Sequence, residues 1–159
     1  MNQLADAVHL VRTFIEDYHE KLEEDYIFPH FEKAGRLTDL VAVLLKQHQA
    51  GRQMTDIVVH QIQQAGRLSD TRPLADNLAA FIRMYRPHAA RESTVLFPQI
   101  AAVVNPKEYE EMGDQFEEIE HQKFGPAGFE GVVQKVAELE KSLGLYDLAQ
   151  FTPKLTQSI

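Results

Sequence analysis

A histidine followed four residues later by a glutamate occurs twice in the chain. The two stretches, which also share a later Phe-Pro pair, read HEKLEEDYIFP at 19–29 and HAARESTVLFP at 88–98. Residues four apart on a helix lie on one face, so each stretch can present an imidazole and a carboxylate to one centre or to two adjacent centres. The repeated pairs, His19 with Glu23 and His88 with Glu92, therefore predict a metal site.

The second pair makes the stronger case, because it lies in an apolar seam. His88 and Glu92 fall on the helical stripe that also contains Phe81, Tyr85 and Val95. Burying an ionised carboxylate without a partner costs several kcal/mol in practice. A carboxylate and an imidazole placed together in such a seam call for a compensating cation.

A third histidine occupies the equivalent seam of the segment between the two stretches. His48 lies there between Leu44 and Gly51. The chain has no cysteine, so the available ligands are imidazoles and carboxylates, which suit iron, manganese or zinc. Carboxylates on facing helices can bridge two cations, which favours a dinuclear centre in the core of a bundle.

The elements that must position these residues are helices, because the apolar spacing steps by three and four almost throughout. The predicted stripes are Leu4, Val8, Val11, Ile15, Tyr18 and Leu22; Val41, Leu44, His48, Gly51, Thr55, Val58 and Ile62; Leu74, Leu78, Phe81, Tyr85, His88, Glu92 and Val95; Tyr109, Met112, Phe116 and Ile119; and a last helix at about 128–143. No strand alternation competes with this pattern. Short connections predict an all-α fold of antiparallel helices packed as a bundle.

Helix ends agree with these stripes. The sequence AGRL occurs twice and places Gly35 and Gly66 where a helix C-terminus prefers a left-handed residue. Asn105 followed by Pro106 is typical of an N-cap with proline at the first helical position. The segment FGPAGF, residues 124–129, predicts a turn between the last two helices.

Proline follows each His–Glu pair. Pro29 and Pro98 are expected to end or kink their helices just beyond the pair. The length of 159 residues predicts one domain over residues 1–150, with residues 151–159 as a C-terminal tail.

Composition excludes several classes of protein. The formal net charge of -8 disfavours nucleic-acid binding, which needs a basic face. No apolar run approaches the roughly 20 residues that span a bilayer, and the first residues do not resemble a signal peptide. These features, with the absence of cysteine, favour a cytoplasmic protein without membrane partners.

The two stretches, with KQHQAG between them, closely resemble the hemerythrin-like (HHE cation-binding) domain over roughly residues 10–125. That family is a four-helix bundle with a non-haem di-iron centre, and its members bind oxygen, sense oxygen or iron, or respond to nitric oxide and oxidants. The resemblance implies that His19, His48 and His88 are terminal ligands and that Glu23 and Glu92 bridge two irons. Zinc or manganese is the alternative metal.

The chain departs from the family pattern in two places. The family's earlier helix, with its further histidine ligand, has no counterpart before His19, and His9 lies on the same helix about 15 Å away. Where oxygen carriers have a histidine four residues after His48, this chain has Arg52, as expected of regulatory relatives. Three ways to complete the centre remain open: a natural N-terminal helix, a second chain, or His121 turning inward.

Four further residues are secondary candidates. Glu20 lies where some relatives use an additional carboxylate, although its helical phase is about 100° from that of His19. His121 is about 200° from the apolar stripe of its own helix, which favours a surface position. Tyr85 either hydrogen-bonds a ligand or packs in the core, and Gly51 either admits a small ligand or permits close helix packing.

The favoured function is a di-iron protein that binds or senses O2 or a related small molecule, with no catalytic acid, base or nucleophile evident beyond the ligands. One alternative is a di-iron enzyme acting on peroxide or nitric oxide. Another is a partner-binding helical bundle with a degenerate site. An apolar face left by a missing helix also predicts a homodimer or larger self-assembly.

Overall fold

The computed structural model describes residues 2–64 and 70–153, and within them every regular element is a helix. The elements are α1 (Asn2–Leu10), η1 (Val11–His19), α2 (Glu20–Leu22), η2 (Glu23–Ile27), α3 (Phe28–Ala34), α4 (Thr38–Gln64), α5 (Arg72–Arg91), η3 (Glu92–Leu96), η4 (Phe97–Ala102), α6 (Pro106–Phe124), η5 (Gly125–Ala127), α7 (Gly128–Ser142) and η6 (Leu148–Phe151). The prediction of an all-α bundle is confirmed.

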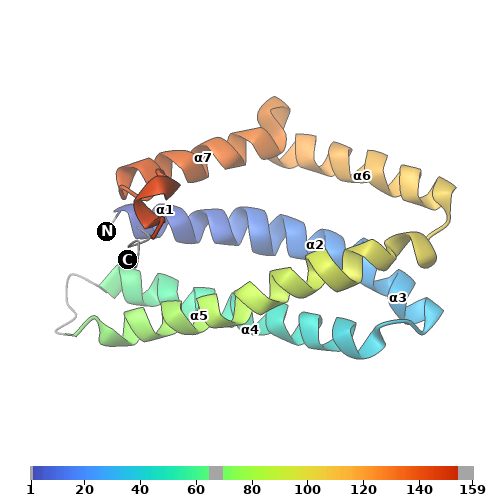
Figure 1. Ribbon diagram of the computed structural model, residues 1–159, viewed down its shortest axis with the longest axis horizontal. Helices are drawn as coiled ribbons and strands as arrows, with labels where there is room; N and C mark the ends of the chain where they lie inside the picture. The colour runs from blue at the N-terminus through green and yellow to red at the C-terminus, as the bar shows by residue number, and fades with distance from the viewer. Residues whose placement is uncertain (1, 65–69, 154–159) are drawn as a thin grey trace, which may run out of the picture.

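The elements from α1 to α3 run on as one long helix, which lies in the middle of the molecule (Figure 1). On one side it meets α4 and α5, which pack against each other. On the other side α6 and α7 form a hairpin, and α7 packs against α1. The first helix therefore has two faces to bury, one toward each neighbour.

The two His–Glu stretches share an irregularity of the backbone. A π-helical turn begins at the glutamate of each stretch, over η2 and over η3, and each turn ends just before Phe-Pro. The N–H of Phe28 bonds to the carbonyl of Glu23, and the N–H of Phe97 bonds to that of Glu92, both five residues back. Widening the helix by one residue makes room for a proline ring that would clash with the preceding turn of an α-helix. The helix consequently continues through Pro29 as α3.

Helix ends fall where the turn residues predicted them. Gly35 caps α3 in the left-handed region at φ 64°. Asn105 accepts a bond from the backbone N–H of Glu108, whose side chain accepts one from the N–H of Asn105, which forms a capping box at the start of α6. Residues 125–127 form the predicted turn before α7, whereas Gly66 lies outside the described residues.

The apolar core lies at the end of the bundle beyond the two Phe-Pro pairs. Its members are Ile27, Phe28, Phe31, Val41, Leu44, Leu96, Ile100, Val104 and Met112. The stripe predicted on α4 is buried from Val41 to Val58, as expected. On the next helix the π turn advances the phase by one residue, so Leu96 is fully buried and Val95 only half-buried.

The stripe predicted for the first helix is only partly correct. Tyr18 and Leu22 are buried, but Val8, Val11 and Ile15 are half-buried. Three carboxylates of this helix, Glu16, Glu20 and Glu23, are each 1 % exposed, and the sequence predicted only the burial of Glu23 among them. No helix of the described residues has the length and apolar character needed to cross a membrane.

Candidate metal centre

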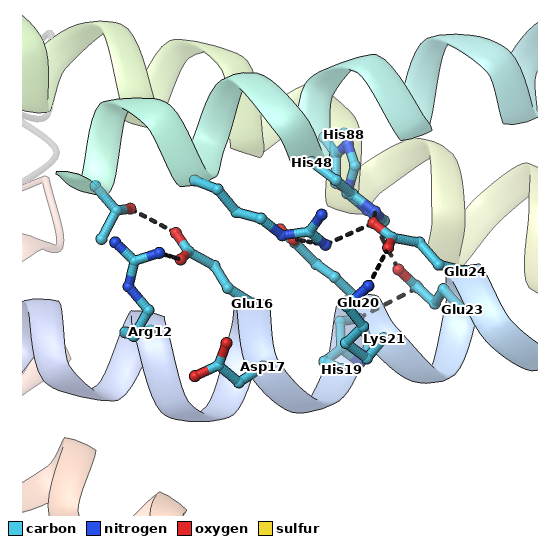
Figure 2. Close-up of polar contacts among 12 residues, drawn as sticks. Arg12, Glu16, Asp17, His19, Glu20, Lys21, Glu23, Glu24, His48 and His88 are labelled. Atoms are coloured by element: carbon cyan, nitrogen blue, oxygen red, sulfur yellow. Dashed lines mark hydrogen bonds and ion pairs between the residues drawn. The ribbon is translucent and has the colours of Figure 1, made fainter. Parts of the chain in front are cut away.

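The first helix contributes a row of glutamates to the interior. Glu16, Glu20 and Glu23 are each 1 % exposed, and Glu24 is half-buried. Figure 2 shows Glu16, Glu20 and Glu24, which are spaced by four, following the side of the helix that faces α4. A π-helical run over η1, where each residue turns the chain through a smaller angle than in an α-helix, helps to keep such a row in line.

Two histidines from the other helices meet this row. The Nε2 atoms of His48 on α4 and His88 on α5 are 3.2 Å apart in the buried interior. His48 Nδ1 donates to a carboxylate oxygen of Glu24 at 3.0 Å, and His88 Nδ1 donates to the side-chain carbonyl of Gln47 at 2.9 Å. Since both Nδ1 atoms donate, both Nε2 atoms of the neutral rings present lone pairs to each other. A cation between or beside them would relieve that contact.

The two repeated glutamates complete the cluster. Glu92 Oε1 lies 2.7 Å from His88 Nε2 and 3.7 Å from His48 Nε2. Glu23 Oε2 lies 3.4 Å from His48 Nε2, and Glu23 Oε1 lies 3.3 Å from His19 Nε2. The repeated pairs, which are 69 positions apart in the chain, thus face one another across one small volume.

Three overlapping groups in this cluster have donor atoms close enough to share an ion. They are His48, His88 and Glu92; His19, Glu23 and Glu92; and Glu20, Glu24 and His48. The first two share Glu92, and Glu23 contacts both His19 and His48. The arrangement therefore offers two neighbouring positions for metal ions, with Glu23 and Glu92 between them. Such an arrangement is typical of a dinuclear site with imidazole and carboxylate ligands.

Several carboxylate oxygens of the cluster lack hydrogen-bond donors. Both oxygens of Glu23, together with Glu92 Oε1, are buried without a hydrogen bond from any described residue. An unsatisfied charged group of this kind is costly in a low-dielectric interior. These orphaned oxygens, together with the paired lone pairs of His48 and His88, fit a bound metal cation.

The two glutamates differ in their electrostatic surroundings. Burial, together with the nearby charges of Glu92 and Glu20, raises the pKa of Glu23 to about 9. Burial also acts on Glu92, but the favourable interaction of its ionised carboxylate with the neighbouring imidazoles of His48 and His88 outweighs burial and holds the pKa of Glu92 below its usual range. Without a metal, the pair is therefore expected to hold one proton near neutral pH, at Glu23.

A second polar network surrounds Glu20. The hydroxyl of Tyr85 donates to Glu20 Oε1 at 2.5 Å, and the guanidinium of Arg52 lies 2.7 Å from Glu20 Oε2. Arg52 also donates to Glu24 Oε1 at 2.5 Å, which is the oxygen that accepts from His48. Arg52 thus supplies the positive charge within the Glu20–Glu24–His48 group.

Glu16 has its own partners at the next turn. Thr55 donates to Glu16 Oε1 at 2.5 Å, and the guanidinium of Arg12 lies 2.7 Å from Glu16 Oε2. Burial nevertheless raises the pKa of Glu16, because desolvation exceeds the effect of the Thr55 hydrogen bond and the Arg12 charge. Glu16 therefore belongs to a separate polar contact and not to the cluster around His48.

The structure brings together His19, Glu23, His48, His88 and Glu92, the five residues that the sequence singled out. Glu20, the weaker candidate for an additional ligand, also points inward, because its face of the first helix lies against α4. His121 is exposed on α6 and belongs to none of the three groups.

Tyr85 and Gly51 form one contact. The Tyr85 ring lies 5.2 Å, centroid to centroid, from the ring of His88. A Cβ atom built on Gly51 would lie 2.1 Å from the Tyr85 hydroxyl, so the tyrosine fills the space above the glycine. Of the two readings of Gly51, the structure supports close packing and not admission of a ligand.

Sequence reasoning missed Glu16, Glu24 and Gln47, and it noted Arg52 only as a replacement for histidine. The spacing of four from Glu16 to Glu20 to Glu24 was a signal that this face of the helix is continuous. The partners of Gln47 and Arg52 come from other helices, and no local pattern indicates them.

Comparisons with known proteins agree with this geometry. The family model for the hemerythrin HHE cation-binding domain matches residues 1–100. Uncharacterized proteins of Mycobacterium bovis and of two Mycobacterium tuberculosis strains are each 51 % identical over 154 residues, covering 94 % of this chain. The chain spans 60 % of the length of these relatives. No solved structure gives a significant match.

Proposed function

The chain belongs to the hemerythrin HHE cation-binding domain family, and on that premise we propose that it binds two iron ions in the cluster and uses them to bind or sense O2 or a related small molecule. The observation that carries the proposal is the convergence of two imidazole Nε2 atoms on the donor-free carboxylate oxygens of Glu23 and Glu92. Zinc and manganese accept the same ligands and are the alternatives to iron.

Each ligand has a distinct part in holding the metal. His48 and His88 would be terminal ligands on the buried side, each with its ring fixed by the acceptor at Nδ1. His19 would be the terminal ligand on the other side, and Glu23 and Glu92 would lie between the two ions. When bound, iron supplies reversible binding of a small diatomic ligand by a change of oxidation state.

The protein around the cluster excludes water and fixes charge. His48 and His88 are almost fully buried, as are both glutamates, so electrostatic interactions there are stronger than in water. The hydrogen bond that Arg52 donates to Glu24 fixes the carboxylate that orients His48. These residues act by positioning the ligands, and the proposed binding function needs no proton donor or nucleophile from the protein.

Elemental analysis of protein purified with and without air tests this proposal, together with a visible spectrum of the oxidised state. We expect about two irons per chain with absorption bands of an oxygen-bridged pair. The His48→Ala variant should lose most of the iron, whereas His9→Ala, which removes an exposed histidine of the same chain, should retain it.

Two results would contradict the proposal. Zinc alone would exclude the iron-based function, and protein that retains no metal after loading with Fe2+ would exclude the site altogether. Adding O2, peroxide or nitric oxide to the iron-loaded protein distinguishes a binding protein from an enzyme. A reversible spectral change without consumption of O2 supports binding or sensing, whereas continuous consumption of peroxide or nitric oxide supports an enzyme.

A further inference from the structure

The side of the cluster that carries His19 is open, unlike the side that carries His48 and His88. The side chain of His19 is 42 % exposed, whereas that of His88 is 3 % exposed. His19 lies in the wall of a cavity of about 610 Å³ between the first helix and α6. A metal ion beside His19 would therefore face this cavity.

The cavity is mostly apolar but has carboxylates in two opposite walls. Phenylalanine, isoleucine, leucine and tyrosine side chains make up most of its lining. The exceptions are His19 and Glu23 from the first helix, with Glu117 and Glu120 from α6. A cation at His19 would attract the carboxylates of the facing wall.

Glu23 connects this cavity to the metal cluster. Its side chain lines the cavity, is 1 % exposed as a residue, and accepts no hydrogen bond at either oxygen from the described residues. A buried carboxylate without donors needs a cation partner. The acidic wall provided by α6 therefore faces an unsatisfied buried group and not merely solvent.

The two glutamates of α6 differ in their freedom to act as ligands. Glu120 is held in place, because it accepts from the Tyr18 hydroxyl at 3.0 Å and from the backbone N–H of Phe129 at 2.8 Å. Glu117 makes no hydrogen bond or ion pair with any residue that the structure describes. Glu117 can thus turn toward a cation without breaking a contact.

We propose that Glu117 of α6 completes the cation site on the His19 side, so that the ligand set is closed by the helix that follows the two His–Glu stretches. The inference rests on the proposed metal-binding function and deepens it. No group that contains Glu117 has its donor atoms within reach of one ion among the described residues, so α6 must approach the first helix when the metal binds. That approach would also bury the apolar walls of the cavity, which favours closure.

His121 is a weaker candidate for this role. It lies four residues beyond Glu117 on α6, in a neighbouring acidic recess that Glu117 and Glu120 also line. Unlike those two glutamates, His121 does not line the cavity at His19. The proposal therefore assigns the closing ligand to Glu117 and leaves His121 at the surface.

Titration of the full chain with Co2+ against a competing chelator tests the assignment. Loss of a residue that only supports a metal ligand typically lowers affinity by about 10- to 100-fold, so loss of a direct ligand in Glu117→Gln should weaken the second, weaker binding step at least tenfold. Glu118→Gln is the matched control, because it removes the same charge one position along α6. Equal affinities for the two variants, or a loss only in His121→Ala, would overturn the proposal.

A distance measurement tests the approach of α6 directly. The chain has no native cysteine, so spin labels can be placed at Gln53→Cys on α4 and Gln115→Cys on α6, both exposed positions. Co2+ should shorten the distance between the labels in this protein but not when Glu117→Gln is added. An unchanged distance on loading would overturn the inference, whereas failure of the unsubstituted chain to bind Co2+, Fe2+ or Zn2+ would instead contradict the proposed function.

Discussion

The two His–Glu stretches have the same local structure and different surroundings. Each has a π-helical turn that begins at its glutamate and ends at Phe-Pro. His88 faces His48 in the dry interior and is fixed by Gln47, whereas His19 is half-exposed beside a cavity. The backbone geometry of the repeat is therefore local, but the environment of each histidine is set by the helices that pack against it.

The glutamates of the two stretches show the same contrast. Glu92 is close to two imidazoles, and its pKa is lowered because their favourable interaction with the ionised carboxylate outweighs the effect of burial. Glu23 has no hydrogen-bond donor, and burial raises its pKa. Equal residues at equal positions of a repeat thus acquire opposite charge preferences from their neighbours.

The largest predicted effect is the difference in metal affinity between variants of His88 and variants of His19. We expect His88→Ala to lower the affinity for Co2+ by more than about 100-fold, because it removes a buried ligand whose position water from solvent cannot reach. His19→Ala should cost roughly tenfold, because water can reach that side. Chelator competition measures both, with circular dichroism to check folding, and an equal or larger loss for His19→Ala would remove the distinction between the two sides.

Stability as a function of pH should reveal the raised pKa of Glu23 in metal-free protein. The unfolded pKa is near 4.5 and the folded pKa about 9, so the stability contributed by the neutral carboxyl is present below 4.5 and is lost as pH rises toward 9. His19 has a lowered pKa and costs stability only below its unfolded value of 6.5, because burial disfavours its charged form. The window from pH 7 to 9 therefore lies above the range in which His19 affects stability, and the Glu23→Gln variant separates Glu23 from Glu16, whose pKa is also raised.

Over that window the free energy of unfolding should fall by up to about 3 kcal/mol, at 1.4 kcal/mol per pH unit. Denaturant unfolding of metal-free protein at several pH values measures the slope. The Glu23→Gln variant should lack the slope, and metal-loaded protein should lack it as well. A stability that is flat or rising from pH 7 to 9 in the unsubstituted protein would contradict the account.

Gly51→Ala should lower the stability of the protein by disturbing the packing of Tyr85. The added Cβ would lie 2.1 Å from the Tyr85 hydroxyl, so the tyrosine must move and leave Glu20 Oε1 without its donor. Overpacking and a lost buried hydrogen bond together should cost about 2 to 3 kcal/mol of stability. Gly113→Ala is the control, since nothing lies within 4 Å of its Cβ position and alanine favours a helix by about 1 kcal/mol. If the two variants change the free energy of unfolding equally, the proposed contact is absent.

Tyr18→Phe should have the smallest effect, on the open side. The variant loses the hydrogen bond from the Tyr18 hydroxyl to Glu120, which helps to hold the hairpin of α6 and α7 against the first helix. The loss should cost about 1 kcal/mol, measured by denaturant unfolding, and should increase hydrogen exchange in α6. Tyr26→Phe is matched to it, because the Tyr26 ring packs on Phe116 of α6 by an edge contact that the substitution retains. Faster exchange in both variants, or in neither, would argue against a role for the hydroxyl.

The helical fold was predictable because its signals are local. Gly35 and Asn105 each specify a helix end through their own backbone and side chain. The stripe on α4 was also predicted correctly, because that helix is regular and its buried face is a single one. Val95 was wrongly expected inside, since the π turn shifts the phase by one residue and brings in Leu96.

The first helix shows why the candidate site could be predicted only in part. Its apolar stripe suggested one buried face, but the helix lies between two layers and buries its glutamates toward α4. The phase argument that made Glu20 a weaker candidate assumed that only one face of the helix is covered. Long-range packing decides how many faces are buried, and a single sequence does not contain that information in local form.

The sequence by itself determined which ligand types are present and that they recur at helical spacing, because these depend on residue identity and on the pitch of a helix. It also determined that thiolates are absent, and therefore that imidazoles and carboxylates are the available ligands. Only the tertiary structure decided that His88 is closed in and His19 open, that Tyr85 occupies the space above Gly51, and that Arg52 holds Glu20 and Glu24. Those facts depend on contacts with residues of other helices. The same contacts set the burial of each ligand, the tautomer of each histidine and the pKa of each glutamate.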